Sequence, residues 1–233
     1  MEPVLESSEA IHLQNVVFGY DRRNPVLHVE ELIVKTGKRV FLYGPSGSGK
    51  TTLLGLITGI LQPQSGSCKV LGQEMTRMSM SARDQLRGSE IGYIFQSLNL
   101  IPYLTVQQNV ALPCHIHARR RKNIVAPTVN EEVQRLINRL ELDTHIDRGV
   151  KKLSTGQQQR VAIARAIIGK PRLVIADEPT SSLDTDRQQA FLELLFEVCD
   201  EAKATLVFVS HDRSLMTRFD EQIALSEVSR VSA

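Results

Sequence analysis

The residues best suited to chemistry lie in one short glycine-rich segment. It reads Gly44-Pro45-Ser46-Gly47-Ser48-Gly49-Lys50-Thr51-Thr52 and follows the apolar stretch 39–43. Glycines let the backbone bend so that successive N–H groups point inward at phosphate oxygens. The residues that follow suit a helix, whose N-terminal end also favours an anion. A strand, a glycine-rich loop and a helix in this order predict a phosphate-binding loop, against the alternative of a surface glycine loop with an unrelated lysine.

Two side chains of this loop complete a nucleotide site. Lys50 is placed to bridge the β- and γ-phosphates, and the Thr51 hydroxyl is placed to bind Mg²⁺. The sequence therefore predicts a protein that binds a nucleoside triphosphate together with Mg²⁺.

Two carboxylates, Asp177 and Glu178, end a second apolar run, 173–176. A continuous apolar run is typical of a strand buried on both faces of a parallel sheet, and open α/β sheets bind ligands at the carboxyl ends of such strands. Asp177 is then placed to hold Mg²⁺, directly or through water, and Glu178 to polarise the attacking water as general base. Taken alone, the pair also fits a strand that ends in a solvated turn.

A third segment, Leu153-Ser154-Thr155-Gly156-Gln157, opens a helical pattern. Ser154 and Gln157 stand three residues apart, which predicts a capping box at the start of the helix. A helix N-terminus beside a glycine is an anion site. Here the sequence resembles the ATP-binding-cassette (ABC) ATPases, whose signature is Leu-Ser-Gly-Gly-Gln.

Further marks of that family follow in the expected order, and the resemblance covers essentially the whole chain. Tyr20 matches the aromatic that stacks on adenine, Gln96 the Q-loop glutamine, and His211 the switch histidine; Ser182-Leu183-Asp184 matches the D-loop. The resemblance implies that ATP is the nucleotide, that Lys50, Gln96, Glu178 and His211 take part in catalysis, and that Thr51, Gln96 and Asp177 hold Mg²⁺. It implies that Ser154, Thr155, Gly156, Gln157 and Asp184 contact ATP.

One signature residue departs from the family pattern. Thr155 stands where glycine is usual. A β-branched residue is stiffer and bulkier than glycine. It either slows closure around the phosphate or adds a hydroxyl contact to it, and the sequence leaves both interpretations open.

The resemblance also implies the fold. We expect an α/β fold with a P-loop NTPase (RecA-like) core, a small antiparallel β subdomain and a helical insert, in one domain over residues 1–233. Residues 1–96 and 153–233 would form the α/β core with the β subdomain, and 97–152 the helical subdomain. Within the insert, apolar residues of 133–140 fall at helical spacing, and Thr128 with Glu131 offers a capping box.

Composition excludes several other classes. The 233 residues suffice for one large α/β unit, and 42% hydrophobic and 23% charged residues are ordinary for a globular protein. The net charge of +2 gives no reason to expect nucleic acid as a partner. No run of about 18 apolar residues is present, and the acidic N-terminus lacks the apolar core of a signal peptide. Three cysteines, Cys68, Cys114 and Cys199, favour a reducing cytosol over a disulfide framework.

Two local clusters have competing interpretations. Cys114-His115-x-His117 offers metal-binding side chains, but no second ligand group at finger-like spacing accompanies it, which disfavours a metal. The run 119–122, Arg-Arg-Arg-Lys, is typical of a solvated loop, with contact to lipid headgroups as the alternative.

The family resemblance also implies partners. One cassette supplies a phosphate loop, and a second cassette supplies the signature, so we expect a head-to-tail homodimer that encloses two ATP molecules. ATP would bridge the dimer and hydrolysis would open it, moving a separate membrane permease. The protein would thus be cytoplasmic and peripheral on the inner face of the membrane.

A finer resemblance concerns the subgroup. Residues 85–87, 91–102 and 104–113 look like the ATPase subunits of lipoprotein-releasing, macrolide-export and cell-division-type systems. A regulator that signals its ATP state without transport would carry the same motifs. Soluble translation or DNA-repair ABC proteins usually join two cassettes or insert long coiled coils, and neither is present. We expect the permease to bind through the surface around Gln96 and the helical insert, with Leu98 and Leu100 as surface residues; the alternative is that these leucines pack internally.

Overall fold

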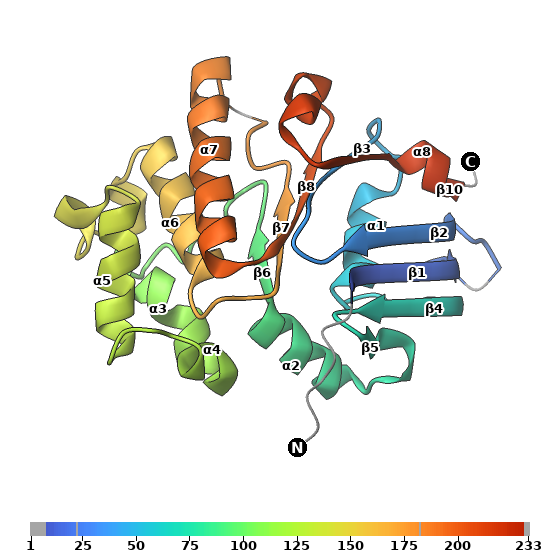
Figure 1. Cartoon of the computed structure of the whole chain (residues 1–233), viewed down its shortest axis with the longest axis horizontal. Helices are drawn as coiled ribbons and strands as arrows, with labels where there is room; N and C mark the ends of the chain where they lie inside the picture. The colour runs from blue at the N-terminus through green and yellow to red at the C-terminus, as the bar shows by residue number, and fades with distance from the viewer. Residues whose placement is uncertain (1–7, 22, 182, 231–233) are drawn as a thin grey trace. The chain divides into compact units, whose positions relative to one another are not determined.

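A computed structural model describes residues 8–21, 23–181 and 183–230 (Figure 1). The chain divides into two compact units. The first unit comprises Met1–Arg87 and Thr205–Ala233, and the second comprises Gly88–Ala204.

The first unit contains the predicted antiparallel layer. Its strands are β1 (Glu9–Phe18), β2 (Leu27–Lys35), β4 (Ser65–Val70), β5 (Gln73–Glu74) and β10 (Ser229–Arg230), in the order β10-β2-β1-β4-β5. Neighbouring strands in this order pair antiparallel. Strands β1, β2 and β4 span ten, nine and six residues, whereas β5 and β10 span two residues each and are too short for a periodic pattern.

The first unit also contains a group of parallel strands. Strand β3 (Arg39–Tyr43) pairs with β8 (Thr205–Ser210) and with β9 (Glu221–Ala224). All residues of β8 are buried, as expected for a strand covered on both faces. Phe41, Phe208 and Phe219 form an aromatic cluster with ring centroids 5.1 to 6.1 Å apart. The other elements of this unit are α1 (Lys50–Ile57), η1 (Met75–Arg77), η4 (Arg213–Arg218) and α8 (Leu225–Val228), and α2 (Met80–Glu90) leads along the chain into the second unit.

The second unit is mainly helical. Its strands β6 (Ile91–Ile94) and β7 (Leu173–Asp177) are parallel. Its helices are α3 (Val106–Ile116), α4 (Ala118–Lys122), α5 (Val129–Arg139), α6 (Thr155–Ile167) and α7 (Thr185–Ala202), with short 3₁₀ turns η2 (Asp143–His145) and η3 (Val150–Lys152). Helices α3, α4 and α5 all lie within 97–152, where the sequence predicted helices; the domain boundaries themselves stay a prediction.

A buried arginine organises this unit. The Arg120 guanidinium donates hydrogen bonds to the carbonyls of Gly88, Ile91, Ala166 and Ile168 at 2.7 to 3.2 Å. Burial lowers its pKa to about 10.

The neighbouring residue Arg119 pairs with the buried carboxylate of Glu90. The interpretation of 119–122 as a solvated loop is therefore wrong. The run forms helix α4, and two of its cations bind buried groups, because carbonyls and a carboxylate inside the unit need donors.

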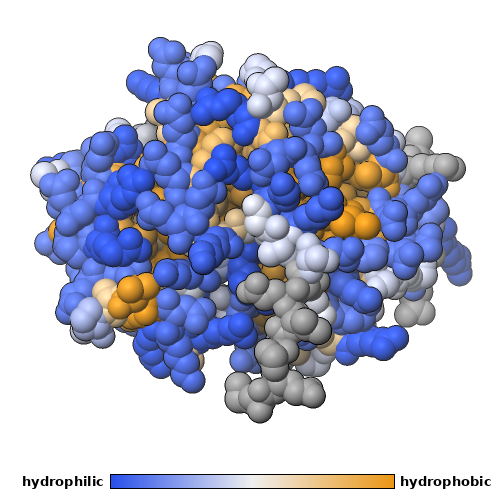
Figure 2. Space-filling model, in the orientation of Figure 1, coloured by the Kyte–Doolittle hydropathy of each residue, from blue (hydrophilic) through white to orange (hydrophobic). Residues whose placement is uncertain are grey.

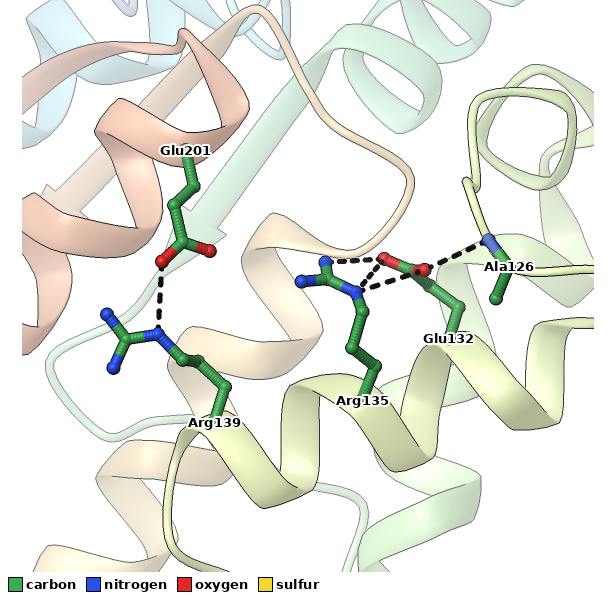
Figure 3. Close-up of polar contacts among 5 residues, drawn as sticks. All are labelled: Ala126, Glu132, Arg135, Arg139 and Glu201. Carbon is green, nitrogen blue, oxygen red and sulfur yellow. Dashed lines mark hydrogen bonds and ion pairs between the residues drawn. The ribbon is translucent and has the colours of Figure 1, made fainter.

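Ion pairs join α5 to α7. Arg139 pairs with Glu197 at 2.7 Å and with Glu201 at 3.0 Å, and Figure 3 shows the second of these pairs. On the same helix, Glu132 is 2% exposed, pairs with Arg135 at 2.8 Å and accepts from the Ala126 amide (Figure 3). Burial alone would raise the pKa of Glu132, but the bonds from Arg135 outweigh it and the pKa is lowered.

The surface is largely polar on the face that Figure 2 shows, with separate hydrophobic areas between hydrophilic side chains. Among the described helices, none combines the length and the apolar character that a membrane span requires.

Candidate active site

The glycine-rich loop of the first unit adopts a conformation that its glycines make possible. Gly47 and Gly49 have φ values of 78° and 91°, a left-handed region that L side chains rarely adopt. Gly49 is the N-cap of α1, and no side-chain hydrogen bond caps this helix in the described structure. The positive end of α1 therefore faces the loop, as a phosphate site requires.

Lys50 and Ser48 give this loop two polar groups that suit a phosphate. The Lys50 ammonium is buried and donates to the carbonyls of Gly44 and Pro45 at 2.9 and 3.0 Å. The Ser48 hydroxyl oxygen is buried without a hydrogen-bond partner among the described residues. A buried hydroxyl that lacks a partner is costly, and a phosphate oxygen would supply one. A cation and a hydroxyl within the same loop therefore fit a phosphate group.

Tyr20 is tied to the same helix. Its hydroxyl lies 3.2 Å from the Thr52 hydroxyl, and its ring packs edge-on against Phe18 with centroids 5.1 Å apart. The Tyr20 side chain is nevertheless 73% exposed. An aromatic face that is fixed in place and open to solvent suits stacking on a base. Thr51, which precedes Thr52, is exposed.

His211 leaves the neighbouring strand at the same edge. Strands β3 and β8 are parallel and paired in register, with Tyr43 opposite Ser210. Gly44 and His211 therefore follow adjacent strand ends, and the His211 side chain is exposed there. The first unit thus places the phosphate loop and His211, the predicted switch histidine, after the ends of neighbouring strands.

The second unit holds the two carboxylates. Asp177 ends β7, and its Oδ2 accepts a hydrogen bond of 3.2 Å from the Tyr93 hydroxyl on the paired strand β6. Burial raises the pKa of Tyr93, and the charge of Asp177 raises it further, so the phenol stays protonated and keeps donating. Sequence reasoning missed Tyr93; its only signal was a polar tip on an otherwise apolar strand that leads to Gln96.

Glu178 has an unusual backbone. Its φ of 45° lies in the left-handed region, which costs a non-glycine residue about 1–3 kcal/mol. Two glutamines hold the turn that follows: Gln159 donates to the Pro179 carbonyl and Gln188 donates to the Thr180 carbonyl, both at 3.2 Å. A strained backbone next to a turn that neighbouring helices hold in place is typical of a functional position.

Gln96 lies near the same turn. It follows β6, and its amide nitrogen donates to the Ser181 hydroxyl at 3.4 Å. Because β6 and β7 are parallel and paired, Gln96 and Asp177 leave adjacent strand ends. The second unit therefore brings Gln96, Asp177 and Glu178 together, with Tyr93 beside them.

The signature segment forms the predicted capping box. The Ser154 hydroxyl accepts from the Gln157 amide at 3.3 Å, and the Gln157 side chain accepts from the Ser154 amide at 3.0 Å. Thr155 is exposed at the first helical position. A Cβ added to Gly156 would meet no described atom within 4 Å. Packing inside the unit does not require this glycine, which leaves room for close approach of another group.

The D-loop residue Asp184 has a local partner. It is the N-cap of α7, accepts from the Arg187 amide at 3.0 Å and pairs with the Arg187 guanidinium at 3.3 Å. A helix cap accounts for its position, and its contact with ATP stays a prediction. Ser182, the other polar residue of the motif, lies outside the described residues.

The two leucines expected on the permease surface differ in exposure. Leu98 is 8% exposed, and Arg165 of α6 donates to the carbonyls of Leu98 and Asn99 at 2.6 and 2.7 Å. The expectation that Leu98 is a surface residue is therefore wrong, because a guanidinium fixes this turn against α6. Leu100 is partly exposed.

Two further expectations concern the helical insert. Thr128 caps the Glu131 amide of α5 as predicted. Within the described part of the chain, no three His, Cys, Asp or Glu side chains gather as a metal site, and Cys114 is buried.

Comparison with known proteins identifies the chain. The family model described as ABC transporter matches residues 27–181. The chain belongs to the ABC transporter family. This ABC protein is an ATP-binding subunit with a P-loop fold, and its activity is ATP hydrolysis.

Its relatives span most of its length. It is 38% identical to the uncharacterized ABC transporter ATP-binding protein YbbA of Escherichia coli (strain K12), with 93% of each chain covered. It is 41% identical to the lipoprotein-releasing system ATP-binding protein LolD of Anaeromyxobacter dehalogenans (strain 2CP-C), covering 86% of this chain and 82% of LolD.

Solved structures of ABC proteins have a similar fold. The dimeric post-hydrolysis state of the ATP-binding cassette MJ0796, bound to ADP and phosphate, has a TM-score of 0.76 at 29% identity, covering 92% of this chain and 93% of that one. CbiO1 from Clostridium perfringens, part of the transporter complex cbiONQ, has a TM-score of 0.79 at 26% identity, covering 94% of this chain and 85% of that one.

Proposed function

We propose that this ABC ATPase closes on ATP as a homodimer and drives a separate membrane permease of the lipoprotein-release type. The observation that carries the proposal is that the chain has one phosphate loop and one signature helix, whose first residues Ser154 and Thr155 are exposed. Two copies arranged head to tail would then complete two sites. The dimeric cassette MJ0796 and the relative LolD support the dimer and the permease type.

Each group of residues has a proposed role in hydrolysis. Tyr20 stacks on adenine, while Lys50 and the loop amides bind the phosphates. Thr51, Gln96 and Asp177 offer the oxygen ligands that Mg²⁺ prefers. Bound Mg²⁺ would neutralise charge on the phosphates. Glu178 takes the proton of the attacking water, and His211 contacts the γ-phosphate.

The dimer is tested with Glu178→Gln. Loss of a general base typically slows hydrolysis by roughly 10²–10⁴, and the neutral amide also removes repulsion against the γ-phosphate. We expect this variant to elute as a dimer in ATP and Mg²⁺ during size-exclusion chromatography with light scattering. Adding Lys50→Ala in the same background should return it to a monomer. A Glu178→Gln protein that binds ATP and stays monomeric, alone and with its permease, would refute the proposal.

The permease would contact the segment after Gln96 through Tyr103 rather than through Leu98. Tyr103 is 83% exposed and follows the exposed Pro102, whereas Leu98 is internal. An exposed aromatic at a rigid turn is a suitable anchor for a partner helix. Tyr103→Asp should release a co-purified permease at unchanged melting temperature, with Tyr103→Phe as the control. Full retention of the permease by Tyr103→Asp would reject this surface.

A further inference from the structure

The signature glutamine has a second partner that the family motifs do not include. Gln157 uses its side-chain oxygen to accept from the Ser154 amide at 3.0 Å. Its side-chain nitrogen lies 2.9 Å from Nε2 of His145, in the turn η2. The other ring nitrogen, Nδ1, lies 2.6 Å from the Thr144 hydroxyl. Thr144, His145, Gln157 and Ser154 thus form one hydrogen-bonded chain that ends at the first turn of α6.

The donor and the acceptor of every hydrogen bond in this chain follow from the Ser154 backbone N–H at its end. The Ser154 backbone N–H can only donate, so the oxygen of the Gln157 amide faces it and the NH₂ group faces His145. An amide NH₂ can only donate, so Nε2 of His145 must accept and carries no proton. The proton is then on Nδ1, which donates to the Thr144 hydroxyl. The capping box therefore selects one neutral tautomer of His145.

We propose that His145 is a positioning residue that holds the signature turn of α6 in its ATP-binding conformation while its imidazole is neutral. This rests on the proposed function of the signature in the dimer. A doubly protonated imidazole has no acceptor, so its Nε2–H would oppose the Gln157 NH₂. Either the Gln157 amide rotates and loses the Ser154 amide, or the His145 ring turns away. Both changes remove support from the turn that carries Ser154, Thr155 and Gly156.

The surroundings of His145 contain charges of both signs. Arg160 of α6 pairs with Glu141, and Arg139 of α5 pairs with two carboxylates of α7. The first turn of α3 packs on this segment through backbone bonds to Ile146 and Arg148, and it carries no charged side chain. The charged residues on the turn itself and on the neighbouring segments are Asp143, Asp147, Arg148, Lys151, Lys152, Glu141, Arg139 and Arg160.

Two substitutions of His145 distinguish the effect of its hydrogen-bond acceptor from the effect of its size. His145→Gln provides an amide oxygen close to the position of Nε2, so the acceptor is kept without a titrating group. His145→Lys reaches one bond further than histidine and offers only donors. His115→Gln is the matched control, because His115 is an exposed histidine elsewhere in the same unit.

The first measurement is amide hydrogen exchange at the first turn of α6, in the monomer without nucleotide. We expect about five- to tenfold faster exchange in His145→Lys, the effect of losing one helix cap, and wild-type exchange in His145→Gln and His115→Gln. Equal exchange in His145→Lys and wild type, or equally fast exchange in both His145 variants, would overturn the inference. This measurement does not depend on dimerisation. The proposed function is tested separately, by size-exclusion chromatography of Glu178→Gln.

The second measurement is the steady-state ATPase rate. His145→Lys should lower kcat about five- to tenfold without changing the ATP affinity of the monomer, which the phosphate loop sets. His145→Gln, which keeps the acceptor, and His115→Gln should both turn over at the wild-type rate. A wild-type kcat in His145→Lys, or an equal loss in His145→Gln, would contradict a role for the acceptor at this position.

Discussion

Replacing Tyr93 by phenylalanine removes one hydroxyl and keeps the ring. That hydroxyl donates to Oδ2 of Asp177 at 3.2 Å, and Tyr93 is half-buried while Asp177 is partly open to solvent. A hydrogen bond to a charged group contributes about 1.5–3 kcal/mol. Water can replace part of it at an open carboxylate, so we expect the lower end, about 1.5 kcal/mol, or roughly tenfold in a binding constant.

The predicted effect is on the gain in ATP affinity that Mg²⁺ provides. Calorimetry in the Glu178→Gln background would compare ATP binding in Mg²⁺ with binding in EDTA. Tyr93→Phe should reduce the ratio of the two affinities about tenfold and leave binding in EDTA unchanged, because the phosphate loop is untouched. Tyr103→Phe is the control, since this tyrosine is 83% exposed. An unchanged ratio would refute the assignment of Tyr93 as the residue that orients Asp177, and a loss of binding in EDTA as well would indicate a packing defect instead.

Three further predictions concern the phosphate loop, the switch histidine and acid stability. Lys50→Ala should abolish measurable ATP binding in calorimetry while the melting temperature without nucleotide stays within a few degrees; unchanged affinity would contradict the site. His211→Ala should lower kcat about 10²-fold or more with ATP affinity retained, as expected of a group that acts on the γ-phosphate, and normal turnover would leave it as a surface residue. Burial opposes ionisation of Glu74, but hydroxyls of Ser67 and Thr76 and two backbone amides lower its pKa from 4.5 to about 2. Its contribution to the free energy of unfolding is therefore present above pH 4.5 and lost as the pH falls towards 2, so wild type and Glu74→Gln should converge in acid denaturation.

The backbone motifs of the site could be predicted from the sequence because they are local. The phosphate loop needs glycines at φ values that only glycine adopts readily, and the capping box needs Ser154 and Gln157 three residues apart. The continuous apolar run of β7 was equally visible.

The contacts that position the site could not be predicted in this way. Tyr93 and Asp177 are 84 residues apart, and no local pattern specifies their bond. The turn that follows the left-handed Glu178 is held by glutamine side chains of two helices, which no pattern next to Glu178 specifies. Leu98 was misplaced because an apolar run next to a functional glutamine gives no sign of which residue Arg165 fixes against α6.

The buried guanidinium of Arg120 links segments that lie far apart in the sequence. It holds the start of β6 through Ile91 and the end of α6 through Ala166 and Ile168. Helix α6 begins at the signature, and β6 ends shortly before Gln96. Because charge-assisted bonds to several carbonyls tie the end of α6 to the start of β6, we expect the two segments to shift together. A tilt of α6 that displaces the signature turn would then also displace the strand that carries Tyr93.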